Sequence, residues 1–441
     1  MSKPEWSAPV KLGVEQLIKS SNKILSKSDI EIRVSENIFR INELGMDWDI
    51  GLVIYEPEDP KKIVVGADGR KAGMFILHGG SGDFRSMDKL NRLLATKFGF
   101  RVVCMTYPGR FYFPDPSRDW PEDTILDDGS LRTPIWLRGE KIEPSEYDII
   151  YDGSLRLRYG TRPVARAKKG TRFFDRMAAW PAAFETAMRH ACASQFPIKD
   201  YSIYVHGHST GGPFVHMLTQ RVENIAGVVG IENSPFGYMY RQMGNIDWPN
   251  PFNELIVRTW RDIARYRGAE ALSKEGPNAL MRLAWLMEEV HDDWIAEKHE
   301  PQFKAEYPIH YAQENTLQAA AKAAAERLKM NEIQREELIA RYIGYTRELS
   351  GPETKPVPPI LLAICKHSRD HTEEVYRKVV IPMYKAMTPA PKVSVTKLAT
   401  GTHFYEKGEE GLPLGLIPPV AEIWYEAIKN GYFLTDEYLS N

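Results

Sequence analysis

Short, continuously apolar segments that alternate with helical segments constrain the fold of this chain most strongly. A strand that is apolar on both faces is buried on both, which is typical of a parallel sheet with helices on either side. Two earlier stretches within 30–56 instead alternate polar and apolar residues, which predicts two half-buried strands. The apolar runs are AGMFIL (72–77), RVVCMTY (101–107), YSIYVHGHS (201–209), IAGVVGIEN (225–233), PILLAIC (359–365) and KVSVTKLA (392–399), with helical segments at about 86–98, 173–194, 211–222, 371–387 and 414–430. We therefore predict a doubly wound α/β fold, with a mostly parallel sheet of about eight strands and an antiparallel start.

Two long segments interrupt this alternation. Residues 110–170 are rich in Pro, Gly, Asp and Arg, which indicates an irregular excursion over the surface of the sheet with some ordered hairpin in it. Residues 236–352 have helical patterns, including the alanine-rich QAAAKAAAERL at 318–328. Because this second segment lies between two core strands, we predict a helical cap at 236–352 inserted into a core formed by 1–235 and 353–441.

Charge and cysteine content exclude several classes of protein. The 441 residues carry a net charge of −2, so no basic field gathers nucleic acid. The chain has no run of 18 apolar residues, which argues against a membrane span, and its start, MSKPEWSAPVKLG, lacks a secretory signal. Three scattered cysteines do not make a disulfide framework. We expect a cytoplasmic protein, which is free to form an oligomer.

The segment from Gly207 to Gly211 reads Gly-His-Ser-Thr-Gly, directly after an apolar strand and directly before a helix. In this position Gly-x-Ser-x-Gly is a nucleophile elbow, a tight turn that exposes a serine hydroxyl above the sheet. Gly207 and Gly211 leave room where the backbone approaches itself, and His208 precedes the serine. Ser209 is therefore the candidate nucleophile.

A serine hydroxyl needs a base, and in this architecture the base and its acidic partner follow the serine along the chain. His403 comes after the last strand, in a loop at a carboxyl end of the sheet, where reacting groups of such enzymes lie. Asp370 follows the strand at 359–365 and is the favoured acid, which would orient the imidazole. The alternative acid is Glu232, at the end of the strand after the elbow.

Two backbone N–H groups are needed to bind an oxyanion. One is expected from Thr210, the residue after the nucleophile. The other is expected from the glycine-rich loop HGGSG at 78–82, with Gly80 as the first choice and Ser81 as the second. The same loop is not a phosphate loop, because no Lys-Ser or Lys-Thr pair follows it.

With His78-Gly79-Gly80, the elbow, Asp370 and His403 in this order, the chain resembles the α/β-hydrolase superfamily. The resemblance covers about 30–110, 171–235 and 357–435 and does not reach a subfamily.

The sequence thus predicts a serine hydrolase that cleaves a carboxylic ester through an acyl-enzyme, with no cofactor and no metal. The same catalytic triad also serves an acyltransferase, an amidase, a lactonase or a carbon–carbon bond hydrolase, and a non-catalytic binding protein on the same scaffold is a further alternative. We expect a small-molecule substrate with an apolar or aromatic part, since the predicted cap contains Trp260, Trp285 and Trp294.

Overall fold

The computed structural model describes residues 11–43, 45–79, 84–108, 171–209, 211–233, 355–368, 371–373, 376–385, 387 and 389–431, with short pieces between 137 and 168 and between 325 and 336. The described residues form a nine-stranded sheet in the order β1-β13-β12-β11-β10-β4-β5-β3-β2. Neighbouring strands are parallel, except that β3 is antiparallel to both β2 and β5. The strands of this sheet are β1 (Lys11–Leu12), β2 (Ile32–Glu43), β3 (Met46–Pro57), β4 (Lys71–Leu77), β5 (Arg101–Met105), β10 (Tyr201–Gly207), β11 (Ile225–Ile231), β12 (Ile360–Cys365) and β13 (Val393–Leu398).

The central strands are apolar throughout because both of their faces are covered. In β4, Phe75 and Leu77 belong to one buried hydrophobic cluster, whereas Met74 and Ile76 belong to a second one. Successive side chains of a strand point to opposite faces, so each cluster fills one side of the sheet. These two layers of core exclude water from the central strands.

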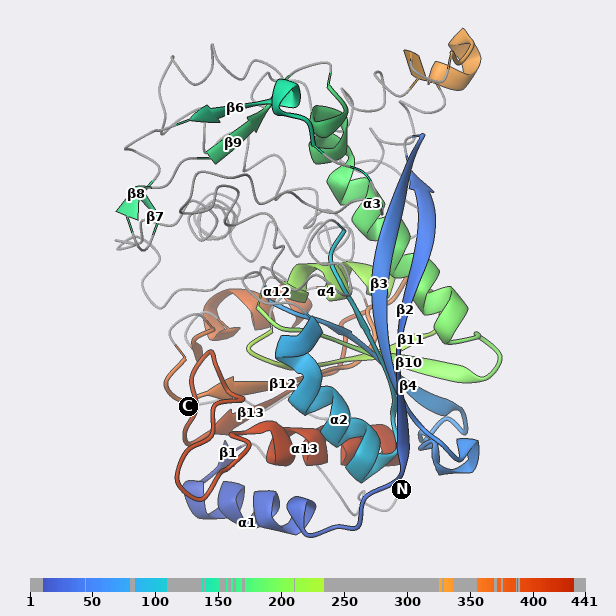
Figure 1. Ribbon diagram of the computed structural model, residues 1–441. Coiled ribbons are helices and arrows are strands. Elements are labelled where there is room, and N and C mark those ends of the chain that lie inside the picture. The colour runs from blue at the N-terminus through green and yellow to red at the C-terminus, as the bar shows by residue number, and fades with distance from the viewer. Residues whose placement is uncertain are drawn as a thin grey trace.

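Helices cover both faces of the sheet (Figure 1). One face carries α1 (Val14–Leu25), α2 (Asp88–Phe98) and α13 (Ile417–Asn430), and the other carries α3 (Arg172–Gln195), α4 (Gly211–Arg221) and α12 (Ile381–Lys385). A π-helical turn over Tyr376–Val380 leads into α12, and 3₁₀ turns cover Pro60–Lys62, Phe84–Met87 and Pro144–Glu146. The predicted doubly wound α/β architecture is confirmed, and it is the α/β-hydrolase fold.

The first described residues differ from the prediction. Sequence patterns pointed to no element before residue 30, yet α1 packs against α13 and buries Leu17 and Ile24. The polar face of α1 also contacts α13, since Lys23 of α1 forms an ion pair of 2.6 Å with Glu422 of α13. The two-residue strand β1 pairs with β13 and raises the described sheet to nine strands. Partners almost 400 residues away explain why local patterns missed this segment.

Within the predicted excursion, the described pieces form two small antiparallel pairs. Strand β6 (Tyr147–Ile150) pairs with β9 (Val164–Ala167), and β7 (Arg156–Leu157) pairs with β8 (Gly160–Thr161). The expected ordered hairpin structure is therefore present. The predicted cap at 236–352 lies almost entirely outside the described residues and stays a prediction, as does the division into core and cap.

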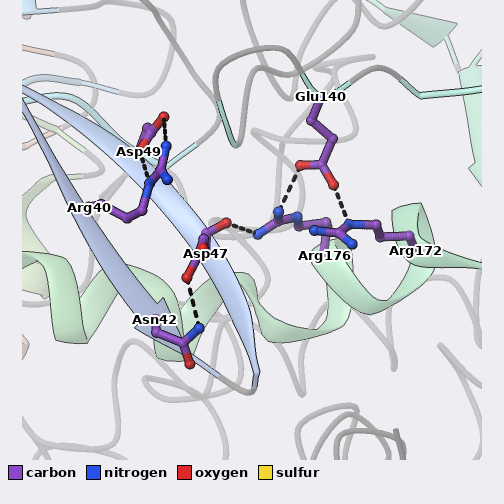
Figure 2. Close-up of polar contacts among 7 residues, drawn as sticks. All are labelled: Arg40, Asn42, Asp47, Asp49, Glu140, Arg172 and Arg176. Carbon is purple, nitrogen blue, oxygen red and sulfur yellow. Dashed lines mark hydrogen bonds and ion pairs between the residues drawn. The ribbon is translucent and has the colours of Figure 1, made fainter. Parts of the chain in front are cut away.

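A buried arginine links the excursion to the sheet (Figure 2). Arg176 of α3 donates to a carboxylate oxygen of Glu140 at 2.7 Å and to the backbone carbonyl of Asp47 near the tip of the β2–β3 hairpin. Its guanidinium lies over the Trp48 ring, 4.7 Å from the centroid. Burial lowers the pKa of Arg176, and the charge of Glu140 opposes that effect. Three segments far apart in the sequence thus meet at one charged side chain.

Among the residues described, no helix combines the length and the apolar character needed to cross a bilayer.

Candidate active site

Ser209 lies on a strained turn between β10 and α4. Its φ of 52° is in the left-handed region, which residues other than glycine rarely adopt. Three backbone hydrogen bonds hold the turn: Ser209 N–H to Glu232 O at 2.9 Å, Gly211 N–H to His208 O at 2.8 Å, and Gly212 N–H to Ser209 O at 3.0 Å. The Ser209 hydroxyl is buried, and its Oγ has no hydrogen-bond partner among the described residues. The expected strand–turn–helix context of the elbow is therefore present.

The glycines around Ser209 are required by close backbone approaches. A Cβ at Gly207 would lie 2.1 Å from Gly211 O, and a Cβ at Gly211 would lie 2.8 Å from His78 O. On the facing loop, a Cβ at Gly79 would lie 3.4 Å from the Ser209 Cβ. The loop after β4 therefore contacts the elbow directly, as the sequence pattern indicated.

The predicted oxyanion donors belong to the elbow and to the loop after β4. Thr210, Gly80 and Ser81 lie outside the described residues, so their N–H groups stay predictions. The stem of the loop is held by Tyr107, which donates a hydrogen bond of 2.5 Å to His78 O and stacks on the His78 ring at 4.0 Å between centroids.

His403 has a carboxylate partner, and that partner is Glu232. The distance between His403 Nδ1 and Glu232 Oε2 is 3.1 Å, and both side chains are buried. Glu232 directly follows β11, and its φ of 51° is again in the left-handed region. Asp370, the favoured acid of the sequence analysis, lies outside the described residues. The carboxylate bound to His403 is thus the one that was held as the alternative.

Glu232 connects the nucleophile to the base. Its backbone carbonyl accepts from the Ser209 N–H, and its side chain accepts from His403. Burial tends to raise the pKa of this carboxyl, but hydrogen bonds and charge from His371 and His403 outweigh burial and hold it well below its usual range. The group is therefore a carboxylate at neutral pH.

Two further side chains reach the same carboxylate from the turn after β12. Ser368 Oγ donates to Glu232 Oε2 at 2.7 Å and accepts from the His371 N–H at 2.9 Å. His371 Nδ1 lies 3.3 Å from Glu232 Oε2. The sequence analysis considered this turn only for Asp370, although two histidines, His367 and His371, lie close to that residue in the sequence. The structure separates these histidines, since His371 is buried at Glu232 and His367 is exposed.

His208 holds the backbone of His403. Its Nε2 lies 3.0 Å from His403 O, and the two rings stack at 4.6 Å between centroids. Burial, followed by the charge of His403, lowers the pKa of His208 well below its usual value. The ring is thus neutral at neutral pH, and its Nε2 carries the proton that the carbonyl accepts. Because His208 directly precedes Ser209, this contact brings residues 209 and 403 into one site.

Two further buried histidines, His206 in β10 and His216 in α4, bind the backbone around the elbow. His206 Nδ1 lies 3.2 Å from Val229 O and its ring packs on Trp424, whereas His216 Nδ1 lies 2.8 Å from Gly212 O. Burial lowers the pKa of His206 to about 3 and that of His216 to about 4. Both rings are therefore uncharged at neutral pH.

Comparisons with known proteins find likeness only among solved structures. No protein-family model matches the chain, and no curated protein matches it. A lipase in an open form is 14% identical with a TM-score of 0.39, and 89% of this chain and 98% of that chain are covered. An esterase is 13% identical with a TM-score of 0.37 and coverage of 95% and 89%. A peroxisomal α/β-hydrolase from Saccharomyces cerevisiae is 10% identical with a TM-score of 0.36 and coverage of 91% and 90%. At this low similarity, none of these structures indicates which reaction this chain catalyses. We therefore infer the reaction from the geometry of the site itself.

Proposed function

Because this chain has the α/β-hydrolase fold, we propose that it is a serine hydrolase that cleaves a carboxylic ester with Ser209, His403 and Glu232 as its catalytic triad. The observation that carries the proposal is the position of Glu232, whose carbonyl binds the Ser209 N–H while its carboxylate binds His403 Nδ1. A strained serine, an imidazole and an ionised carboxylate therefore occur together at the carboxyl ends of β10, β11 and β13.

In the proposed reaction, His403 Nε2 takes the proton of the Ser209 hydroxyl while Oγ attacks the ester carbonyl. Glu232 keeps the other proton of the imidazole on Nδ1 and stabilises the imidazolium that forms. His403 then protonates the leaving alcohol, which departs and leaves an acyl-enzyme. A water that gives its proton to His403 attacks the acyl group, and the acid is released as the proton returns to Ser209.

The Ser209 hydroxyl is not hydrogen-bonded to His403 in this structure. Catalytic hydrogen bonds are often longer without substrate and shorten in the complex. The proposal therefore includes a small rotation of the Ser209 side chain or the His403 ring when the ester binds. The predicted N–H donors of Thr210 and Gly80 then hold the oxyanion.

Turnover of p-nitrophenyl esters by the unmodified protein and four variants tests this proposal. Ser209→Ala and His403→Ala should each lower kcat by at least about 10³-fold, because each removes a group that forms or breaks a bond. Glu232→Gln should lower kcat at least about 100-fold, whereas Asp370→Asn should stay within about threefold of the unmodified protein.

The pair of acid variants decides which carboxylate belongs to the triad. A large loss in Asp370→Asn with little loss in Glu232→Gln would move the assignment back to Asp370. Unchanged turnover in Ser209→Ala, or failure of Ser209 to react with a fluorophosphonate probe, would contradict the serine mechanism altogether.

A further inference from the structure

Glu232 has one imidazole more than a catalytic triad uses. His403 Nδ1 lies 3.1 Å and His371 Nδ1 lies 3.3 Å from the same oxygen, Glu232 Oε2. The ligand atoms of all three residues lie within 4.8 Å of one another. The rings of His371 and His403 are parallel, with 2° between their planes and 5.5 Å between their centroids. Two imidazoles thus present the same nitrogen to one carboxylate oxygen.

The charge at this point is unusual for a protein interior. Glu232 and His371 are fully buried, and His403 is 8% exposed. Within the described part of the chain, Glu232 forms ion pairs with these two histidines and with no lysine or arginine. Buried carboxylates are usually paired with a cation or bound to a metal ion. A metal ion held between the three side chains would supply that positive charge.

We propose that Glu232, His371 and His403 bind a zinc ion. Two imidazole nitrogens and one carboxylate oxygen form a donor set that suits zinc, whereas magnesium and calcium prefer oxygen donors alone. Zinc lies about 2.0–2.2 Å from such ligands in a tetrahedral arrangement, which separates neighbouring ligand atoms by about 3.3 Å. The two distances to Glu232 Oε2 already have nearly this length, and the third distance, between the two imidazole nitrogens, is at most 4.8 Å.

Zinc at this position inhibits the enzyme, an effect that rests on the proposed function. In the proposed reaction, His403 carries a proton on Nδ1 and accepts the Ser209 proton on Nε2. Zinc binds an unprotonated Nδ1, so the remaining proton of a neutral His403 is on Nε2, and an imidazolium releases its second proton to solvent. With a proton on Nε2, His403 no longer accepts one from Ser209. The metal also engages the carboxylate that would stabilise the imidazolium.

Isothermal titration calorimetry of zinc chloride into the metal-free 441-residue protein tests the site. The unmodified protein should bind one zinc ion, and His371→Gln should weaken zinc binding at least about tenfold. Even the replacement of a residue that only orients a metal ligand lowers metal affinity by about this factor. His367→Gln is the matched control, since it removes an exposed histidine from the same turn and should leave the affinity unchanged. Equal affinities of His371→Gln and the unmodified protein would overturn the proposal, as would the absence of saturable binding.

A second measurement needs no variant. X-ray absorption at the zinc edge of the unmodified complex should show imidazole nitrogens and an oxygen at about 2.0–2.2 Å, and a shell without imidazole would refute the site. Zinc binding together with no ester turnover in the metal-free protein would contradict the proposed function and leave the metal site standing. Ester turnover by a protein that binds no zinc would contradict the metal site and leave the proposed function standing.

Discussion

Gly207→Ala tests the close backbone approach on which the elbow depends. The added Cβ would lie 2.1 Å from Gly211 O and 2.3 Å from the Gly211 carbonyl carbon. Nonbonded carbon and oxygen atoms stay above about 3 Å, so the turn must open by about 1 Å. Ser209 lies between these two glycines and moves with the backbone. A displacement of about 1 Å at a reacting group costs about 100-fold in rate, or about 2.7 kcal/mol of activation free energy.

The assay is kcat/KM for a p-nitrophenyl ester, with circular dichroism to verify folding. In Gly211→Ala, kcat/KM should fall less, by about 10-fold. The added Cβ would lie 2.8 Å from His78 O, so a smaller backbone shift relieves the overlap. Gly13→Ala is the control, since its Cβ would make an ordinary contact of 3.5 Å with Gln16 Oε1. A folded Gly207→Ala protein within about threefold of the original kcat/KM would refute the reasoning. So would a greater loss in Gly211→Ala than in Gly207→Ala.

Two further predictions concern stability. His206 stays neutral in the folded chain down to about pH 3 but binds a proton below about pH 6.5 when unfolded, so the free energy of unfolding falls as the pH falls through this window. In urea titrations from pH 4 to 6, His206→Phe should make this dependence shallower by up to about 1.4 kcal/mol per pH unit, and an unchanged slope would contradict the burial of a neutral ring. Glu140→Gln leaves the buried Arg176 without its carboxylate and should cost about 3–5 kcal/mol in chemical denaturation. Arg377→Gln breaks the exposed pair with Glu373 and should lower the free energy of unfolding by about 0.5 kcal/mol or less. Equal losses in Glu140→Gln and Arg377→Gln would contradict the larger contribution expected of the buried pair.

Local sequence patterns were sufficient for the architecture because both faces of the central strands are buried. Such strands leave continuous apolar runs, and the helices between them leave a periodic stripe. The helix expected at 173–194 is α3 at Arg172–Gln195, and the run at 72–77 is β4 at Lys71–Leu77. The elbow is equally local, because a sharp turn between a strand and a helix requires small residues at both of its ends. Neighbouring residues therefore determined the central strands, the helices between them and the position of Ser209.

Which carboxylate binds His403 was decided only by the tertiary structure. Asp370 and Glu232 each follow a buried parallel strand, so no local pattern separates them. Glu232 reaches His403 because its left-handed backbone and the Ser209 N–H bond hold it beside the elbow. The same holds for Ser368 and His371, whose role depends on a side chain more than 130 residues earlier. Contacts between distant segments leave no periodic mark in the sequence, because they depend on how separate strand ends are placed together in space.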